Sequence, residues 1–310
     1  MKDKKKKSPV GYSLILPATS ANLGPAFDAA ALAFDLTFHI TGKLATKYSI
    51  HASGRDNAVC SELENNLILK TYKDVLTSNG KEVLPMAIRI QNRIPIGKGC
   101  GSSAAARLAG IAFAVHFGKL KWKDAEIIAA ASRLEHHPDN AAACWLGGVA
   151  VARMAADEVQ AVKITPRGKW PLLLVVPEEK LATEEARRVL PTTYSRADAV
   201  ANIQNSMLLL AAFTQGRRDL LKNALEDRIH QPYRAPLCPL LPALQNLAGE
   251  HGILGVVLSG AGPSVLMFLD PAVPAGPTRR RVAEFLKRRS LSAELLPTSI
   301  AMRGTVRKVI

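Results

Sequence analysis

A strand, a glycine-rich turn and a helix follow one another in the first half of this 310-residue chain, and they constrain the fold more than any other segment. Residues 86–96, MAIRIQNRIPI, alternate apolar and polar side chains, as a strand with one buried face does. Gly97, Gly99 and Gly101 follow directly, in the stretch GKGCG. SSAAARLAG comes next and predicts a helix over residues 102–117. The turn therefore connects a strand to the N-terminus of a helix.

The glycine-rich turn has the properties of an anion-binding site. Glycine lacks a Cβ, so backbone N–H groups can converge on a ligand, and a helix N-terminus adds unpaired donors and partial positive charge. Ser102 or Ser103 can offer a hydroxyl to a metal or a phosphate, and Lys98 adds a cation. The turn is not a P-loop, since no Lys precedes Ser102, and a dinucleotide fingerprint would need glycine at that position. An isolated turn of this kind is a structural connection as often as a binding site.

A second group of polar residues lies in RLEHHPDN, residues 133–140. An apolar stripe predicts a helix over residues 124–135 that Pro138 stops, so Glu135 falls in the last turn, where a carboxylate opposes the helix dipole. A nucleotide-bound Mg²⁺ would remove this conflict, because Mg²⁺ prefers one or two carboxylates with phosphate oxygens and water. Solvation of Glu135, or pairing with Arg133 or another basic neighbour, is the simpler explanation.

The polar residues on either side of Pro138 also have structural explanations. Asp139 and Asn140 can cap the short helix AAACWL that follows. A lone histidine such as His137 is usually a half-buried side chain with a satisfied hydrogen bond. Their own context therefore gives none of the three a catalytic role.

Chain length and cysteine usage favour a two-domain protein of a reducing compartment. With 48% hydrophobic residues, 310 residues suffice for a large core and two domains. The four cysteines form no CxxC pair, which argues against a zinc site or a redox motif. No signal-peptide pattern and no run of about 18 apolar residues is present. We therefore expect a cytoplasmic protein that does not enter a membrane.

The net charge of +15 is partly local. Residues 1–7 read MKDKKKK, and we expect residues 1–9 to form a disordered basic tail. A second basic cluster, at 279–281 and 287–289, has the spacing of an exposed helix face. Positive surfaces attract phosphorylated anions and nucleic acid alike, but only 5% of the residues are aromatic, with no aromatic–basic interleaving. Nucleic-acid binding is therefore the weaker hypothesis, and we expect no nucleic-acid partner.

Strand and helix signals are mixed along the rest of the chain. TPRGKWP, residues 165–171, separates strand-like segments and predicts a domain boundary, with one domain at 10–165 and another at 166–310. ILGVVL, SGAGP and SVLMFL predict two strands joined by a tight turn over residues 253–269. Further helices are expected at 183–190, 195–214, 219–229, 240–251 and 277–289.

Three motifs, taken in order, resemble those of the GHMP kinases. They are PATSANLGPAFD at 17–28, PIGKGCGSSAA at 95–105 and LSGAGPSVLMF at 258–268, with HPDN at 137–140 between the last two. EARRVLP at 185–191 and PYR at 232–234 are most similar to the homoserine kinase branch. The resemblance runs from about residue 10 to the C-terminus, and the combination of motifs is specific where a single one is not.

The resemblance implies an α+β protein of two-domain GHMP kinase architecture, with an N-terminal ribosomal-protein-S5-like domain and a C-terminal ferredoxin-like domain. It also implies ATP-dependent phosphorylation of the side-chain hydroxyl of L-homoserine to O-phospho-L-homoserine, with Mg²⁺, in threonine biosynthesis. The resemblance is compatible with a homodimer, and it does not require a side chain to act as a general base.

The resemblance also assigns roles to individual residues. The residues expected to wrap the ATP phosphates are Pro95, Ile96, Gly97, Lys98, Gly99, Cys100, Gly101, Ser102, Ser103, Ala104 and Ala105. Ser102 and Glu135 would hold Mg²⁺, and Asn140 would contact the reacting hydroxyl. The residues expected to bind the amino-acid substrate are Asn22 and Asp28 at its ammonium group, Arg187 and Arg234 at its carboxylate, and His137 and Thr183 as positioning groups.

Elementary chemistry agrees with an amino-acid substrate, since a zwitterion needs an anion for its ammonium group and the planar fork of arginine suits a carboxylate. The family pattern is broken at Ala26, Ala31 and His136, where glycine is usual. These departures leave another small alcohol open as substrate, such as threonine, shikimate or an isoprenoid precursor. A ligand-sensing relative without activity is a further alternative, which the intact glycine loop, Ser102 and Glu135 disfavour.

Overall fold

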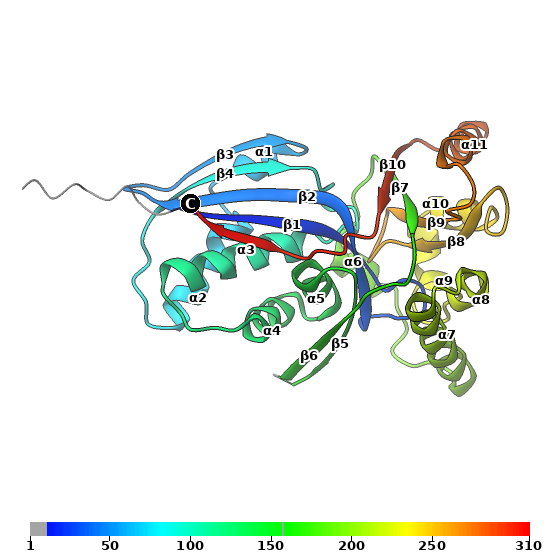
Figure 1. Ribbon diagram of the computed structural model, residues 1–310, viewed down its shortest axis with the longest axis horizontal. Helices are drawn as coiled ribbons and strands as arrows, with labels where there is room; N and C mark the ends of the chain where they lie inside the picture. Colours follow the sequence, from blue (N-terminus) through cyan, green and yellow to red (C-terminus); the bar gives the residue numbers. More distant parts are fainter. Residues whose placement is uncertain (1–10, 157) are drawn as a thin grey trace, which may run out of the picture.

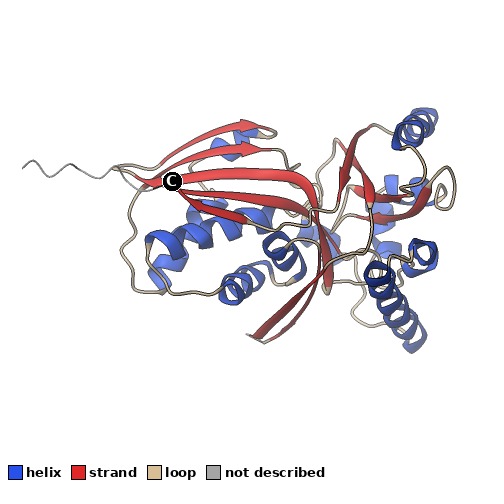
Figure 2. Ribbon diagram, in the orientation of Figure 1, coloured by secondary structure: helices blue, strands red, loops and turns tan. Residues whose placement is uncertain are grey.

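The computed structural model describes residues 11–156 and 158–310, so the predicted basic tail lies outside the described residues. The chain forms two sheets side by side, and helices and strands are mixed in both parts of the molecule (Figures 1 and 2). Within the described residues no helix combines the length and the apolar character that crossing a bilayer requires.

The first sheet has seven strands in the order β11-β1-β2-β4-β3, and β5 and β6 extend it from β2. The strands are β1 (Tyr12–Ala21), β2 (Ala30–Leu44), β3 (Ser49–Gly54), β4 (Met86–Asn92), β5 (Val149–Ala155), β6 (Glu158–Ile164) and β11 (Val306–Val309). β3 and β4 are parallel, and the other pairs are antiparallel. β2 has 15 residues, enough to pair with β4 at one end and β5 at the other.

Helices α2 to α5 cover one face of the first sheet (Figure 1). The helices of this part are α1 (Asn57–Ser61), α2 (Leu67–Ser78), α3 (Ser102–Phe117), α4 (Asp124–Glu135) and α5 (Asp139–Leu146). Small residues let them pack closely: Ala105, Ala109 and Ala112 of α3 are buried in the same core as Leu14 and Leu16 of β1. The core thereby fixes the end of α3 that follows the glycine loop.

The second sheet has four antiparallel strands in the order β10-β7-β9-β8. They are β7 (Pro171–Pro177), β8 (Ile253–Leu258), β9 (Val265–Leu269) and β10 (Ala293–Ser299). Its helical elements are α6 (Thr183–Arg188), α7 (Arg196–Gln215), η1 (Arg218–Leu220), α8 (Leu221–Ala224), α9 (Gln231–Arg234), η2 (Ala235–Leu237), α10 (Leu240–Gln245) and α11 (Ala275–Arg288).

β7 reads PLLLVVP because both faces of the second sheet are covered. Leu172 and Leu174 belong to the core that includes Phe213 of α7, whereas Leu173 belongs to a second core with Val282 of α11. A strand buried on both sides has a continuous apolar run rather than an alternating one. The second domain is therefore a sheet between two helical layers.

The predicted elements agree with the structure to different degrees. The helices expected at 102–117 and 124–135 are confirmed, and α10 ends at Gln245, short of the expected residue 251. The helix expected at 219–229 is wrong. There the chain forms only η1 and α8, because the Asp227 carboxylate accepts hydrogen bonds from the backbone N–H groups of Ile229, His230 and Gln231.

The chain passes from the first sheet to the second between Ile164 and Pro171, where the boundary is predicted. It does not stay there, because β11 pairs with β1 and returns the C-terminus to the first sheet. The division at residues 165 and 166 stays a prediction, since the last strand lies in the first sheet.

Candidate functional site

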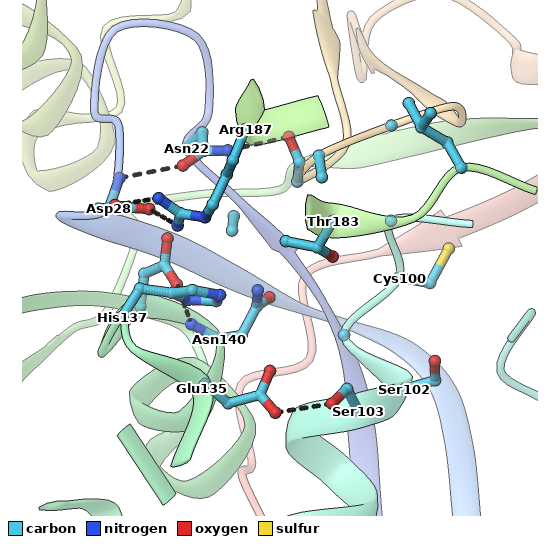
Figure 3. Close-up of a pocket in the computed structure, with 18 of the residues that line it drawn as sticks. Asn22, Asp28, Cys100, Ser102, Ser103, Glu135, His137, Asn140, Thr183 and Arg187 are labelled. Carbon is cyan, nitrogen blue, oxygen red and sulfur yellow. Dashed lines mark hydrogen bonds and ion pairs between the residues drawn. The ribbon is translucent and has the colours of Figure 1, made fainter. Parts of the chain in front are cut away.

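A cavity of about 110 Å³ lies among segments from both sheets (Figure 3). The β1–β2 loop, the glycine loop, the α4–α5 junction, α6, α9 and the β8–β9 turn all contribute to its wall. The side chains predicted to act on substrate or metal all line it: Asn22, Asp28, Ser102, Glu135, His137, Asn140, Thr183, Arg187 and Arg234. The structure thus brings together residues that are up to 212 positions apart in sequence (234 − 22).

Part of the glycine loop lines this cavity. Gly97, Gly99, Cys100, Gly101, Ser102 and Ser103 line the cavity. A Cβ at Gly99 would lie 2.1 Å from the Ser259 carbonyl oxygen, and one at Gly101 would lie 1.8 Å from Thr19 Oγ1. Both glycines have positive φ, so these positions exclude other residues on two grounds.

The predicted phosphate loop extends beyond the residues that reach the cavity. Ile96 and Ala105 line an adjoining cavity, while Pro95 and Ala104 are buried and line neither. Lys98, expected as a mobile cation, donates from Nζ to the Pro177 carbonyl oxygen at 2.7 Å. Its side chain therefore ties the loop to the end of β7.

Glu135 lies at the end of α4, facing the first turn of α3. Its Oε1 accepts hydrogen bonds from Ser103 Oγ at 2.6 Å and from Arg107 Nε at 2.5 Å. Arg107 is therefore a basic partner of Glu135. Arg107 follows Ser103 by four positions and so lies on the same helix face.

Ser102 and Glu135, the predicted metal ligands, both line the cavity, but the serine whose hydroxyl contacts Glu135 is Ser103. Successive residues of a helix are about 100° apart around its axis, so adjacent serines point in different directions. Figure 3 shows Ser103 directed at Glu135 and Ser102 on the other side of the helix end. The sequence fixes the pair of serines but not which one faces α4.

Asn22 and Asp28 are held in a tight loop between β1 and β2. Both have left-handed backbone conformations, which Asn and Asp adopt more readily than other side chains. Asn22 Oδ1 accepts a hydrogen bond from the Asp28 backbone N–H at 3.0 Å, and Asn22 Nδ2 donates to the Gly260 carbonyl oxygen at 2.9 Å. Asn22 therefore joins this loop to the β8–β9 turn.

Asp28 and Arg187 form a two-point ion pair. Arg187 Nη2 lies 2.6 Å from Asp28 Oδ1, and Nη1 lies 3.0 Å from Oδ2. Burial would lower the pKa of Arg187, but the hydrogen bonds and charge of Asp28 raise it above its ordinary value. The residues predicted to hold opposite ends of a zwitterion thus balance each other's charge.

A buried pair, His137 and Asp139, lies beside Asp28. His137 Nδ1 is 2.7 Å from Asp139 Oδ1; burial alone would lower the pKa of His137, but Asp139 raises it above its ordinary value. Asp139 Oδ2 is buried and has no hydrogen-bond partner among the described residues. One ligand atom each of Asp28, His137 and Asp139 lies within 4.8 Å of the others. A group of this kind is complementary to an ammonium group or another small cation.

The capping role considered for Asp139 and Asn140 is not seen. Pro138 is the N-cap of α5, without a side-chain cap, and Asp139 is the first helical residue, whose Oδ1 accepts from the Asn140 backbone N–H at 2.6 Å. Asn140 Oδ1 accepts from Thr19 Oγ1 at 2.6 Å. This contact fixes the amide of Asn140 and directs its nitrogen away from Thr19.

Arg234 is 1% exposed, and no carboxylate pairs with it among the described residues. Nε donates to the Ala186 carbonyl oxygen at 2.9 Å, and Nη1 donates to the Gly260 carbonyl oxygen at 3.3 Å. Burial and the charge of Arg187 lower the pKa of Arg234 to about 10. A buried guanidinium without a counter-ion, in the wall of a cavity, is complementary to an anion.

An adjoining cavity of about 340 Å³ shares Gly97, Ser102 and Ser103 with the first. Its other walls are mainly apolar, with Phe38, Val59, Leu67, Ile68, Ile90, Ile94 and Ile96 among them, together with Cys60, Asn65 and Asn66. The sequence did not predict this cavity, because its walls come from β2, β4, α1, α2 and α3. It has the size and apolar lining of a site for a flat organic ring.

The three departures from the family pattern, Ala26, Ala31 and His136, are absent from the described lining of both cavities. Ala26 and Ala31 are buried core residues, 4% and 0% exposed. His136 has φ 64° and ends α4 in the left-handed conformation, where glycine is usual. Their contribution is therefore to the backbone around the site.

Comparisons with known proteins agree with these observations. The family model for the GHMP kinases N terminal domain matches residues 66–148, and that for the GHMP kinases C terminal matches residues 209–288. The homoserine kinase of Solibacter usitatus is 40% identical over 94% of this chain and 96% of its own. The homoserine kinase of Deinococcus radiodurans is 34% identical over 95% of this chain and 96% of its own.

Solved structures show the same fold. The crystal structure of homoserine kinase from Cytophaga hutchinsonii superposes with a TM-score of 0.82 at 24% identity, covering 100% of both chains. That of mevalonate diphosphate decarboxylase from Staphylococcus aureus gives a TM-score of 0.68 at 14% identity, covering 97% of this chain and 98% of its own.

Proposed function

The chain belongs to the GHMP kinase family, and from this premise we propose that it transfers the γ-phosphoryl group of ATP to the side-chain hydroxyl of L-homoserine. The predicted family and two-domain α+β fold are confirmed. Relatives that match over nearly the whole chain at 34–40% identity are homoserine kinases. The product, O-phospho-L-homoserine, belongs to threonine biosynthesis.

The observation that carries the proposal is a pair of unmet groups in the cavity wall, one positive and one negative. Asp28 and Arg187 pair with each other, whereas Arg234 has no carboxylate partner and Asp139 Oδ2 has no hydrogen-bond partner among the described residues. A bound amino acid would place its ammonium group against the acids and its carboxylate against the arginines. Arg234 gains the counter-ion that it lacks, and Asp139 gains a donor.

ATP would lie along the glycine loop. The first turn of α3 has no side-chain cap, so its N–H groups are available to phosphate oxygens. The adjoining apolar cavity would take the adenine base, since it meets the loop at Gly97, Ser102 and Ser103. The triphosphate then ends beside the amino-acid cavity.

The residues beside the phosphate site fit a magnesium ion. Ser103 and Glu135 offer a hydroxyl and a carboxylate 2.6 Å apart, which are ligands that Mg²⁺ prefers. We assign the metal to Ser103 and Glu135 in place of the predicted pair Ser102 and Glu135. When bound there, Mg²⁺ would neutralise charge on the phosphate oxygens. Arg107 would keep the Glu135 carboxylate in a fixed orientation.

In the transfer step, the homoserine side-chain oxygen forms a bond to the γ-phosphorus, and the bond from that phosphorus to the bridging oxygen of ADP breaks. The hydroxyl proton passes to a phosphate oxygen, so no side chain need act as base. Asn140 would orient the hydroxyl, and His137 and Thr183 would position the carbon chain. Phosphoryl transfer depends mainly on such positioning and on charge neutralisation.

A panel of alcohols tests this proposal. The purified protein is given ATP, Mg²⁺ and L-homoserine, L-threonine, shikimate or mevalonate, and ADP release and the phosphorylated product are measured. L-homoserine is expected to give the highest kcat/KM. 4-Hydroxybutanoate is a matched control that lacks the ammonium group and keeps the carboxylate and the reacting hydroxyl at the same spacing, and its kcat/KM is expected to fall at least about tenfold, since it leaves buried acceptors unpaired. Turnover of another alcohol without turnover of homoserine would refute the proposal.

The compartment and assembly remain part of the proposal. All four cysteines are buried and unpaired, which supports a reducing compartment such as the cytoplasm. The homodimer left open by the family stays a prediction.

A further inference from the structure

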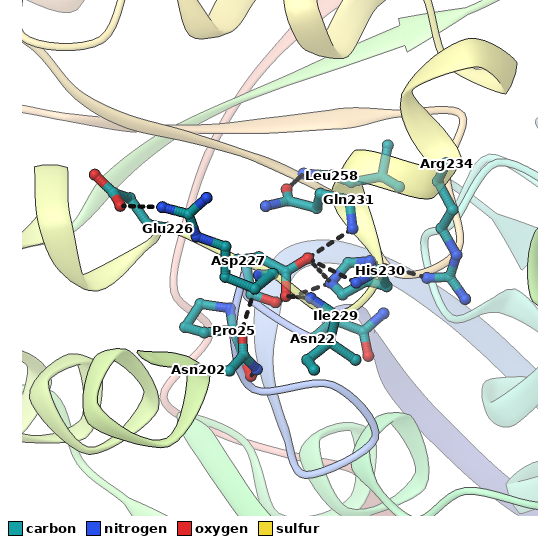
Figure 4. A network of polar contacts seen from close by, with 12 residues as sticks. Asn22, Pro25, Asn202, Glu226, Asp227, Ile229, His230, Gln231, Arg234 and Leu258 are labelled. Atoms are coloured by element: carbon teal, nitrogen blue, oxygen red, sulfur yellow. Dashed lines mark hydrogen bonds and ion pairs between the residues drawn. The ribbon is translucent and has the colours of Figure 1, made fainter. Parts of the chain in front are cut away.

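His230 has no role in the proposed reaction, yet it is fully buried beside two parts of the substrate cavity. Its Nε2 lies 2.8 Å from the Gly24 carbonyl oxygen, in the loop that carries Asn22 and Asp28. Its Nδ1 lies 3.1 Å from Nη1 of Arg234, four residues along the chain. Figure 4 shows the ring in a polar network that ends at Arg234. His230 thus connects the loop expected at the ammonium group with the arginine expected at the carboxylate.

The neighbours of His230 fix its protonation. A carbonyl oxygen only accepts hydrogen bonds, so Nε2 carries the proton and donates to Gly24; Asp227 Oδ2, 3.4 Å from Nε2, is also an acceptor. A guanidinium group only donates, so Nδ1 is unprotonated and accepts from Arg234. Burial and the charge of Arg234 lower the pKa of His230 to about 4, although Asp227 acts in the opposite direction. The ring is therefore neutral near pH 7, in one tautomer.

The backbone on which His230 is mounted is held by Asp227. Its carboxylate accepts hydrogen bonds from the N–H groups of Ile229 at 2.9 Å, His230 at 3.0 Å and Gln231 at 2.6 Å. Gln231 Oε1 in turn accepts from the Leu258 N–H at 2.7 Å, at the end of β8. The ring thus has a fixed position relative to the β8–β9 turn.

The contacts of Arg234 fix the plane of its guanidinium group. Nε donates to the Ala186 carbonyl oxygen at one edge, and Nη1 is shared between His230 and the Gly260 carbonyl oxygen. Phe27 lies against both partners, with its ring centre 5.3 Å from the Arg234 guanidinium carbon and 5.3 Å from the His230 ring centre. A bidentate interaction with a carboxylate requires the plane to be set in advance, because each N–H must meet one oxygen.

We propose that His230 is a positioning residue for carboxylate recognition: its neutral Nδ1 orients the Arg234 guanidinium while its Nε2–H holds the loop that bears Asp28. Through these two hydrogen bonds, His230 ties the loop that bears Asp28 to Arg234. This inference rests on the proposed function, since it takes the ligand to be an α-amino acid.

Two variants separate the bonds that His230 makes. In His230→Asn, the side-chain oxygen occupies the place of Nδ1 and can still accept from Arg234, but the side chain is too short to reach Gly24. In His230→Gln, the terminal amide can reach Gly24, but no acceptor is left beside Arg234. We expect His230→Gln to raise the KM for L-homoserine roughly 10- to 100-fold, as loss of a buried hydrogen bond to a charged group does. We expect the KM for ATP to change less than about twofold. We expect His230→Asn to raise the homoserine KM less than His230→Gln does, because Asn202 and Ser206 also donate to the Pro25 carbonyl oxygen of the loop that bears Asp28.

A substrate without a carboxylate distinguishes positioning from a general structural effect. 3-Aminopropan-1-ol keeps the ammonium group and the reacting hydroxyl of homoserine at the same spacing. Its kcat/KM is expected to be low but equal in wild type and His230→Gln, because Arg234 has nothing to bind. An unchanged homoserine KM in His230→Gln, or equal losses on both substrates, would overturn the inference.

A measurement on the wild-type protein covers the case in which a variant does not fold. With ¹⁵N-labelled histidine, the Nδ1 resonance of His230 is expected at the shift of an unprotonated nitrogen and should move when L-homoserine binds. A protonated Nδ1, or no response to homoserine in a protein that phosphorylates it, contradicts the inference. Absence of homoserine turnover in wild type would instead refute the proposed function, and the protonation of Nδ1 would still decide whether His230 orients Arg234.

Discussion

Replacing Ser103 with alanine tests the assignment of the metal site, and Ser102→Ala is its matched control. Both serines are in the first turn of α3, and both line the cavity. Only Ser103 contacts Glu135, at 2.6 Å. The two variants remove the same atom at adjacent positions, so a difference between them reports on which hydroxyl meets the metal.

The expected size of the effect follows from two losses. Ser103→Ala removes a hydrogen bond to a charged carboxylate, a contribution of about 1.5 kcal/mol or roughly tenfold. It also removes a ligand of Mg²⁺, and even residues that only orient such ligands typically contribute about 10- to 100-fold. Arg107 still holds Glu135 at 2.5 Å, so the carboxylate stays in place. We expect kcat to fall about 10- to 100-fold in Ser103→Ala and less than about threefold in Ser102→Ala.

The assay measures initial rates of ADP release at saturating ATP and L-homoserine over a range of free Mg²⁺. Ser103→Ala should require more Mg²⁺ for half its maximal rate, whereas Ser102→Ala should follow the wild-type curve. Binding of a fluorescent ATP analogue, with and without Mg²⁺, gives a second measure that does not depend on turnover. Equal effects of the two substitutions, or a larger effect at Ser102, would refute the assignment and restore Ser102 as the ligand.

Three further predictions concern the two cavities. Arg234→Lys should raise the KM for L-homoserine about tenfold or more in steady-state kinetics, because a point charge replaces a planar fork, and an unaltered KM would mean that the carboxylate binds elsewhere. The pKa of His137 is raised in the folded protein, so the stability that its protonated form gains from Asp139 is present below about pH 6.5 and lost as the pH rises through the raised value. The melting temperature of wild type should therefore exceed that of His137→Gln by more at pH 6 than at pH 9, and an equal difference at both would contradict this. Cys60 lines the proposed adenine cavity, and burial raises the pKa of its thiol, so alkylation of Cys60 should be slow. Bound ATP should slow it further, as mass spectrometry of the alkylated protein would show. Alkylation at the same rate with and without ATP would argue against that cavity as the site of the base.

Local signals in the sequence were enough to predict the elements around the site. Pro138 and the apolar stripe before it predict where α4 ends, and the step from glycine to serine predicts where α3 begins. The order of the motifs then identifies the family, which the comparisons confirm. These features depend on neighbours in the chain, so they can be read without tertiary structure.

Features that depend on packing could not be predicted. The choice between Ser102 and Ser103 depends on the rotation of α3 relative to α4, and the ion pair between Asp28 and Arg187 joins residues 159 positions apart. The sequence contained one indication that Arg107 belongs to this site, because Arg107 follows Ser103 by four positions and so lies on the same helix face. The expected helix at 219–229 failed because the side chain of Asp227 takes the backbone hydrogen bonds that a helix would use.

The charges of the cavity explain why an amino acid suits it better than the other alcohols. Asp28 and Arg187 already balance each other, which leaves two unmet requirements: an anion for Arg234 and a donor for Asp139 Oδ2. Shikimate and mevalonate carry a carboxylate but no ammonium group, so they would satisfy Arg234 and leave a buried acceptor of Asp139 without a partner. A ligand without an ammonium group would shield that acceptor from water and give it no donor, so we expect such substrates to bind more weakly than an amino acid. Threonine meets both requirements and differs only in where its hydroxyl lies, so discrimination against it depends on the distance from Asn140 to the phosphate end of the glycine loop.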